Sequence, residues 1–193
     1  MTLFHPQMAQ SFRDHVQTLV APGTTSFVFV SADSLSQTFA AYTQAFVSGG
    51  CTKALALVDE TDTGIVPYLS VRANLLINSR GPALNQLPEA LRQDTLFLDQ
   101  PASQLTPAES LYVQFFRGLM GKRSVILAKG LPAVMVPTET RAFLSFANQA
   151  LAGTHSRFVI LTADQSLIDA HPDHSFTRAP SLAAASDGTK KHA

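Results

Sequence analysis

Two short apolar runs place the tightest limit on how this chain can fold. They are FVFV at residues 27–30 and SVILA at residues 124–128, and neither alternates with polar residues. A strand that is apolar on both faces is typical of a parallel sheet covered by helices on both sides. Other strand-like runs alternate along the chain with longer stretches of helical period, as in βαβ units. The sequence therefore predicts an α/β domain with a mainly parallel sheet flanked by helices, and with these two runs at its centre.

The expected strands are five runs rich in β-branched and aromatic residues: His15–Val20, Ser26–Val30, Ala54–Val58, Ser124–Ala128 and Arg157–Thr162. The expected helices are six stretches with a helical spacing of apolar residues: Ser36–Val47, Leu69–Asn78, Pro88–Thr95, Pro107–Met120, Thr138–Leu151 and Gln165–Ala170. The helix at 107–120 has the clearest start, because Thr106 can cap it and Glu109 can complete a capping box. Pro107 occupies its first position, where a missing N–H costs nothing.

Length and charge indicate one domain without an electrostatic partner. The chain has 193 residues, and we expect a single domain over residues 1–180, followed by a small, polar, loose tail at 181–193. Only 15% of the residues are charged, against about 25% in an average protein. The 14 basic residues balance the 14 acidic ones, so the chain has no basic footprint for nucleic acid.

The same sequence predicts a cytoplasmic protein without direct membrane insertion. Its start lacks the basic region and the apolar core of a signal peptide, and no window approaches 18 uninterrupted apolar residues. The single cysteine, Cys51, cannot form an internal disulfide. The segment at 169–174 holds two histidines and two aspartates that could bind zinc, but Pro172 interrupts it. We therefore favour a solvated loop there and expect no metal site.

Four stretches of the chain, in the same order, resemble segments of the ABC ATPases, the nucleotide-binding domains of ABC transporters. FRDHVQTLVAPGTTSFVFV at 12–30 resembles the opening strand pair that leads into the phosphate loop. VPYLSVRANLLI at 66–77 resembles the segment after the glutamine loop, and HSRFVILTADQSLI at 155–168 resembles the last strand with its switch. LDQPASQLTPAESLYVQFFRGLMGKRSVILAKG at 98–130 resembles the signature motif followed by the Walker B strand. The resemblance implies a P-loop-NTPase-like fold whose helical arm is reduced to about residues 69–105.

The letters that carry the chemistry of this family are replaced at the phosphate loop. The family has G-x-x-x-x-G-K-[ST], in which the glycines let backbone N–H groups wrap the phosphates and the lysine meets the β- and γ-phosphates. The matching residues here are SADSLSQT. Ser31 and Ser36 stand in place of the glycines, Gln37 stands in place of the lysine, and Thr38 is retained. We interpret Thr38 as a helix cap rather than as a phosphate ligand.

The other motifs of the family are replaced as well. The Walker B Asp-Glu pair becomes Ala128 and Lys129, and the switch histidine becomes Ala163. In the signature, Pro107 and Ala108 stand where the family has glycines, between Thr106 and Glu109. Two positions stay open: the glutamine loop falls near Glu60 or Thr61, and the aspartate after Walker B is replaced by Met135 or Val136. We expect the Lys129 amine to extend from its strand end to water.

The replacement of these motif residues predicts a protein that does not hydrolyse ATP. Phosphoryl transfer depends almost wholly on positioned charge and metal, so a chain that lacks the lysine and both carboxylates has little catalytic machinery. No cofactor and no catalytic residue are therefore expected. Weak binding of ATP or ADP stays open, because a helix that starts near Ser36 would still offer backbone donors to an anion.

The resulting interpretation is a catalytically inactive ABC-ATPase-like protein that acts as a regulatory or structural partner of another protein, for which an ABC transporter subunit is the leading candidate. The alternatives are a nucleotide or small-ligand sensor without turnover, an ATPase subunit active only with a partner, and a generic α/β domain. Any self-association should be independent of nucleotide, because neither SADSLSQT nor LTPAES offers a glycine-rich set of donors. Attachment to a membrane would then run through the partner.

Overall fold

A five-stranded parallel sheet forms the middle layer of the protein. The structure, a computed structural model, describes residues 6–77, 79 and 84–182. The strands are β1 (Thr25–Phe29), β2 (Leu55–Val58), β3 (Val125–Lys129), β4 (Arg157–Thr162) and β5 (Ser175–Phe176). They pair in the order β2-β3-β4-β1-β5, and every pair is parallel. The expected fold class is thereby confirmed.

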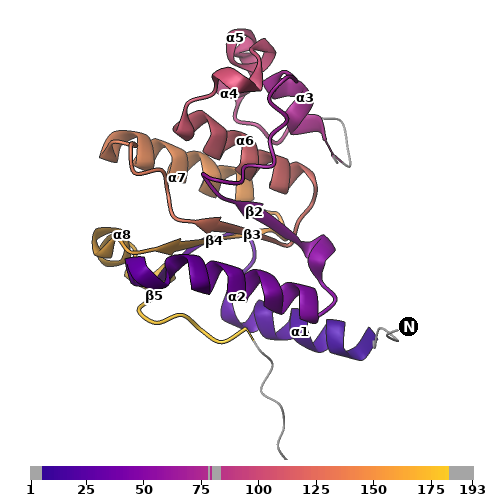
Figure 1. Cartoon of the computed structure of the whole chain (residues 1–193). Coiled ribbons are helices and arrows are strands. Elements are labelled where there is room, and N and C mark those ends of the chain that lie inside the picture. The colour runs from indigo at the N-terminus through magenta and orange to yellow at the C-terminus, as the bar shows by residue number, and fades with distance from the viewer. Residues whose placement is uncertain (1–5, 78, 80–83, 183–193) are drawn as a thin grey trace, which may run out of the picture.

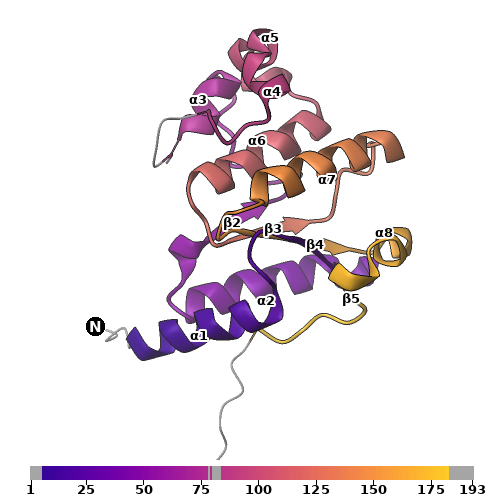
Figure 2. The same cartoon turned by 180° about the vertical axis from the view of Figure 1, so that it is seen from behind.

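Helices cover both faces of this sheet (Figures 1 and 2). One face carries α1 (Pro6–Leu19) and α2 (Leu35–Ser48), and the other carries α6 (Pro107–Met120) and α7 (Pro137–Leu151). Three short helices form a further layer beyond α6: α3 (Val71–Leu76), α4 (Glu89–Gln93) and α5 (Thr95–Asp99). The helix α8 (Gln165–Ala170) follows β4, and none of the helices in the described ranges is long and apolar enough to cross a membrane.

The two apolar runs are buried from both sides, as their lack of alternation predicts. In β1, Phe27 packs toward α6 and α7, whereas Val28 packs toward α1 and α2. In β3, Ile126 and Leu127 divide between the same two cores. Both strands are interior, but the middle position belongs to β4, all six residues of which are buried. The expectation that the two runs form the centre is therefore corrected by one strand position.

Four phenylalanine rings tie α6 and α7 to the middle strand. Phe115 and Phe116 come from α6, Phe143 from α7 and Phe158 from β4, and each is at most 1% exposed. The Phe115 ring lies 4.9 Å from that of Phe158 and 5.8 Å from that of Phe143, measured between centroids. Such packed aromatic pairs add stability beyond the area that they bury.

The first expected strand is wrong: residues 15–19 belong to α1, and no strand precedes β1 in the described residues. The reason is the spacing of the apolar residues. Phe12, Val16 and Val20 are four residues apart, which places them on one face of a helix, and all three are buried against α2 and the sheet. The β-branched residues at 15–20 therefore follow a helical period and not the period of a strand.

The other expected strands and helices are confirmed with small changes of boundary, and the helices at 107–120 and 165–170 match in full. The expected helix at 69–78 is shorter, since Ser70 caps α3 and Ile77 ends it, while Asn78 lies outside the described residues. The helix expected at 88–95 ends at Gln93, and the sequence did not predict α5 or the two-residue β5.

The expected tail packs against the body at its start. The Tyr42 hydroxyl donates a hydrogen bond to the Pro180 carbonyl at 2.7 Å, and burial raises the pKa of Tyr42 to about 12. Leu182 is only 9% exposed and belongs to the core beneath α1 and α2. Leu182 thus packs with the body, and residues 183–193 lie outside the described part of the chain.

The ring cluster gives a first prediction. Replacing Phe115 by Ala should lower the free energy of unfolding by about 3–5 kcal/mol, because it leaves a cavity between α6, α7 and β4. Urea unfolding followed by circular dichroism measures the loss. Leu96→Ala is the matched control, since Leu96 is 86% exposed and its truncation should change stability little. Equal losses in the two variants would contradict this account of the core.

Candidate functional site

The candidate site lies at the carboxyl edge of the sheet, where β1, β3 and β4 all end. Phe29 pairs with Thr162, and Leu161 pairs with Lys129, so the three following loops start side by side. The structure therefore brings Ser31, Lys129 and Ala163 to one edge. Ligands of open α/β sheets bind in such crevices at the carboxyl ends of the strands.

The segment after β1 is a tight turn that runs directly into α2. A short 3-10 helix spans Ala32–Ser34, and α2 begins at Leu35. The Ser34 N–H donates to the Ser31 carbonyl at 2.9 Å, and the Leu35 N–H donates to the Ala32 carbonyl. No residue from 30 to 38 has a positive φ, the backbone conformation that curls successive N–H groups around a phosphate. Two N–H groups of the segment that leads into α2 are thus already used within the turn.

The side chains of this segment lie on the helix rather than in a phosphate-binding loop. α2 begins at Leu35, one residue before the expected start, and Ser36 and Gln37 are exposed in its first turn. Thr38 lies four positions inside α2 and does not cap it, which corrects the cap interpretation. The Ser31 hydroxyl donates to the Ser34 hydroxyl at 3.1 Å, a contact that closes the turn on itself.

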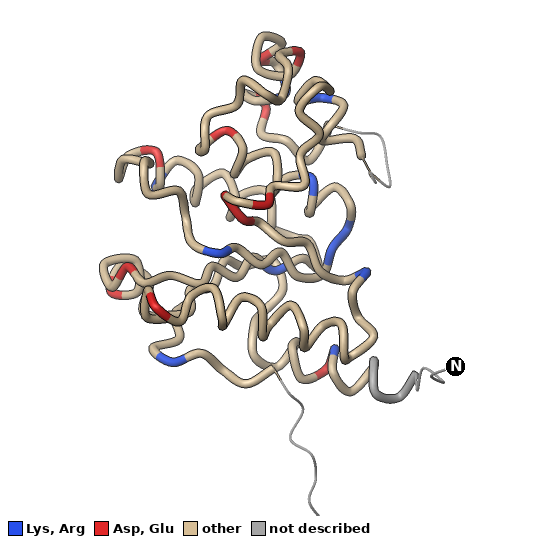
Figure 3. Tube along the Cα trace, viewed as in Figure 1, with Lys and Arg blue, Asp and Glu red and all other residues tan. Residues whose placement is uncertain are grey.

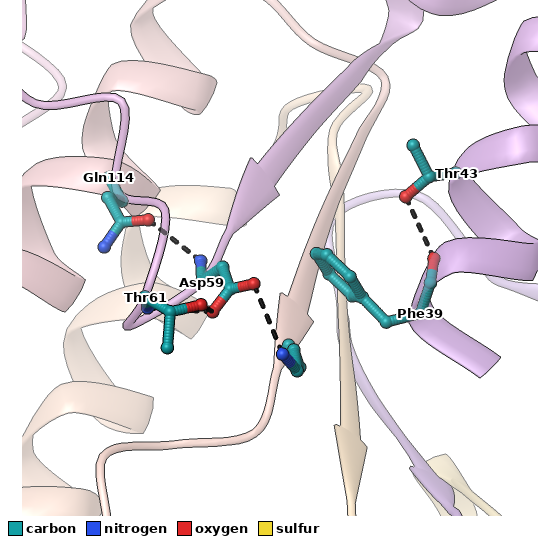
Figure 4. Close-up of polar contacts among 6 residues, drawn as sticks. Phe39, Thr43, Asp59, Thr61 and Gln114 are labelled. Atoms are coloured by element: carbon teal, nitrogen blue, oxygen red, sulfur yellow. Dashed lines mark hydrogen bonds and ion pairs between the residues drawn. The ribbon is translucent and has the colours of Figure 1, made fainter. Parts of the chain in front are cut away.

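Lys129 at the end of β3 is held by the carboxylate of Asp59, which Figure 4 labels. Its Nζ lies 3.5 Å from Oδ2 of Asp59, and the exposed side-chain fractions are 22% for Lys129 and 13% for Asp59. The amine therefore ends on a carboxylate, and the Lys129 side chain is partly exposed. Asp59 directly follows β2, and the pairing of Val58 with Ala128 places it beside Lys129. The parallel register of two strand ends thus creates the ion pair.

Three further contacts fix Asp59 in place (Figure 4). Its Oδ1 accepts hydrogen bonds from the N–H and the hydroxyl of Thr61, both at 2.9 Å, and its own N–H donates to Oε1 of Gln114 at 3.0 Å. Desolvation raises the pKa of Asp59, but the bonds from Thr61 and the charge of Lys129 outweigh it and lower that pKa below its ordinary 3.8. Gln114, on α6, is only 3% exposed and donates in turn to the Ser110 hydroxyl.

The signature segment forms a closed helix start. The Thr106 hydroxyl accepts the Glu109 N–H at 3.2 Å, and the Glu109 carboxylate accepts the Thr106 N–H at 2.8 Å, so the expected capping box is confirmed. Pro107 and Ala108 occupy the first turn between them. The carboxylate of Glu109 therefore occupies the end of α6 that an anion would otherwise approach.

A cavity of about 330 Å³ separates this helix start from the ends of β2 and β3. Its polar lining comes from Glu60, Thr63, Thr106, Ser110, Gln114 and Lys129. Its apolar lining includes Ile65, Leu105, Leu111 and Leu131. The cavity thus joins the signature segment to Lys129, whereas the turn at 31–38 and Ala163 lie outside its lining.

Solved structures of ABC transporter components share this architecture. The structure of cbiO1 from Clostridium perfringens, part of the ABC transporter complex cbiONQ, matches with a TM-score of 0.62 at 13% identity. The match covers 82% of this chain and 74% of the cbiO1 chain. A bacterial Atm1-family ABC exporter with ATP bound gives 0.58 at 13% identity, over 77% of this chain and 31% of its own. An ATP-binding subunit of an ABC transporter gives 0.57 at 12% identity, over 80% and 73%.

The chain has an ABC ATPase-like fold. At 12–13% identity the likeness concerns the fold, and no protein-family model or curated protein matches the sequence. Within this ABC ATPase-like fold, the sequence did not predict a role for Asp59 or Gln114. The available signal was the register, since pairing the runs at 54–58 and 124–128 places the following Asp59 and Lys129 side by side.

The histidine segment has a structural explanation. His171 ends α8, its Nδ1 lies 3.0 Å from the Leu167 carbonyl oxygen, and its ring stacks on Phe27 with centroids 4.6 Å apart. Within the described ranges, no three His, Cys, Asp or Glu side chains gather into a group that could hold a metal ion. After β4, Ala163 offers only a methyl group, and the neighbouring Asp164 caps α8.

The ion pair predicts a pH-dependent effect of Asp59→Asn. At pH 7 this change should lower the free energy of unfolding by about 2 kcal/mol, because it removes charge-assisted bonds and leaves Lys129 without its counter-charge. The folded-state pKa of Asp59 is lowered, so its contribution is present above the ordinary 3.8 and is lost as the pH falls through the lower folded value. The gap between wild type and variant should therefore shrink between pH 5 and about pH 2.

Urea unfolding at pH 7, 5, 4 and 3 measures this gap. Asp33→Asn is the matched control, because Asp33 is an exposed carboxylate in the turn before α2 and no ion pair holds it. A gap for Asp59→Asn that stays constant with pH would show that the carboxylate acts only through its shape.

Proposed function

We propose that this protein is a non-hydrolysing ABC-ATPase-like protein that serves as a regulatory or structural partner of an ABC transporter system. The observation that carries the proposal is the Lys129–Asp59 ion pair. Lys129 stands where the family has the Walker B carboxylates, so an ammonium held by Asp59 occupies the place at which that family binds a metal cation. A cation there repels magnesium and cannot act as a general base.

The turn at 31–38 supports the same proposal. The phosphate loop of the family is replaced by SADSLSQT, which has no lysine and forms a 3-10 turn at Ala32–Ser34 followed by the start of α2. The role as a partner rests on the fold, because the similar solved structures are themselves parts of ABC transporters. The protein would work in the cytoplasm and reach the membrane through its partner.

The proposal predicts no ATP turnover above background by the purified chain with magnesium. The measurement is phosphate release over several hours, with Thr38→Ala run in parallel because Thr38 is the one phosphate-loop letter retained. Turnover that Thr38→Ala abolishes would overturn the proposal. Turnover that appears only after an intact ABC ATPase subunit is added would favour an ATPase that borrows catalytic groups.

Thermal melting separates a partner protein from a nucleotide sensor. A ligand at about 100 times its Kd adds about 2.7 kcal/mol to the stability of the folded state. We expect no such shift with millimolar ATP or ADP, and we expect ABC transporter subunits to co-purify with the tagged chain from its own cells whether or not ATP is added. A dimer or complex that forms only with ATP and magnesium would contradict this.

A small-ligand sensor is the second candidate, and the cavity beside Lys129 favours it. At about 330 Å³ it falls within the usual size of ligand pockets, and it combines apolar walls with a few convergent polar groups. A metabolite that raises the melting temperature of wild type, but not of Gln114→Leu, would support this function.

A further inference from the structure

The outer side of β2 is an unpaired strand edge. β2 is the end strand of the sheet and pairs only with β3. No residue of the described ranges hydrogen-bonds the backbone of Leu55–Val58 from the other side. Leu57 is 38% exposed on this strand. A free edge of this kind is a template for an additional strand.

A groove of about 300 Å³ runs beside this edge. Leu55 and Leu57 of β2 form one wall, and Val66 and Ile77 contribute apolar surface to it. Arg117 of α6 fixes the loop that borders the groove, because its guanidinium donates to the Gly64 carbonyl at 2.7 Å and to the Thr63 carbonyl at 3.4 Å. The space next to the strand is therefore bounded by anchored elements.

Basic side chains follow the same edge. Lys53 precedes β2, Arg117 and Arg123 line the groove, and Lys122 lies in the turn before β3. Figure 3 shows blue segments near the start of β2 and red segments near its end. The acidic residues after β2 are Asp59, Glu60 and Asp62. The ion pairs of the described residues are Arg72–Asp99 and Lys129–Asp59, so none of these four has an acidic partner there. The two arginines use three donors between them of the ten that they carry.

The positions of these basic residues do not suit a role in which charge only prevents the edge of β2 from pairing with another strand. Proteins often blunt an edge by putting charged residues on the strand itself. Here all four residues of β2 are apolar, and the charges flank the strand instead of interrupting it. The groove therefore keeps an unpaired strand edge and an apolar wall beside two arginines, and no carboxylate of the described residues lines it.

The charges also select among occupants. A second copy that paired in the parallel sense would bring two basic clusters together, and like charges across a strand pair are destabilising. An antiparallel copy would instead place the basic start of one β2 beside Asp59, Glu60 and Asp62 of the other, and the measurement of dimer formation separates that occupant. The residues at 183–193 carry two lysines and one aspartate, so they are net basic as well. An acidic segment meets neither objection.

We propose that the free edge of β2 and its groove bind an extended acidic segment of a partner protein by strand addition. The backbone of the segment continues the sheet beyond β2, and its carboxylates meet Arg117 and Arg123. This deepens the partner role proposed above by naming its surface and the chemistry of the partner. It requires no nucleotide.

A displayed library of random nonapeptides, selected on the full chain, tests the proposal. The peptides selected are expected to lack proline, to be rich in Asp and Glu, and to alternate these residues with Val, Ile or Thr. Each selected peptide is called a winning peptide. Lys53→Glu combined with Arg123→Glu should weaken binding of a winning peptide by about tenfold or more. Arg141→Glu, an exposed reversal on α7, is the matched control and should leave binding unchanged. Circular dichroism checks that both variants stay folded.

Backbone pairing has its own readout. A winning peptide with one central N-methyl group keeps its charge but loses a strand hydrogen bond, so it should bind much more weakly. Slower amide exchange in β2 on binding would place the peptide at this edge. Winners without acidic enrichment, equal binding by the double variant, or no winners at all would overturn the proposal. A dimer of wild type that the double variant strengthens or weakens would assign the edge to a second copy instead. All of these measurements omit nucleotide, so their failure is separable from that of the ATPase prediction.

Discussion

Burial of the sheet on both faces orders the rest of this structure. β1, β3 and β4 carry large apolar side chains on alternate sides, so helices must cover both faces before any of these strands is stable. α1 and α2 supply one cover, and α6 and α7 supply the other. With both faces filled, only the ends of the strands and the outer edges of the sheet are left for polar chemistry.

At the carboxyl end, the polar groups described here bind one another. Lys129 and Asp59 join the ends of β3 and β2, and Gln114 connects that pair to α6. The start of α6 is closed by its own capping box, and the turn after β1 is closed by Ser31 and Ser34. These contacts connect the strand ends and the two helix starts to one another.

The outer edges of the sheet differ from each other. β5 is only two residues long, which leaves little backbone available for pairing. β2 is longer, its Leu57 is partly exposed, and basic side chains lie near its start. The two arginines beside β2 therefore keep unused N–H donors next to a free strand edge.

The sequence alone determined the layered α/β architecture, most of the element boundaries and the capping box at Thr106, because apolar period and cap chemistry are local properties. It misplaced the first element, where β-branched residues follow a helical spacing, and it missed β5, which is too short to leave a pattern. Only the tertiary structure decided the partner of Lys129. Asp59 is 70 positions away along the chain, and the two meet because β2 and β3 pair in parallel register. The open edge of β2 is likewise set by strand order, which emerges when the whole sheet assembles.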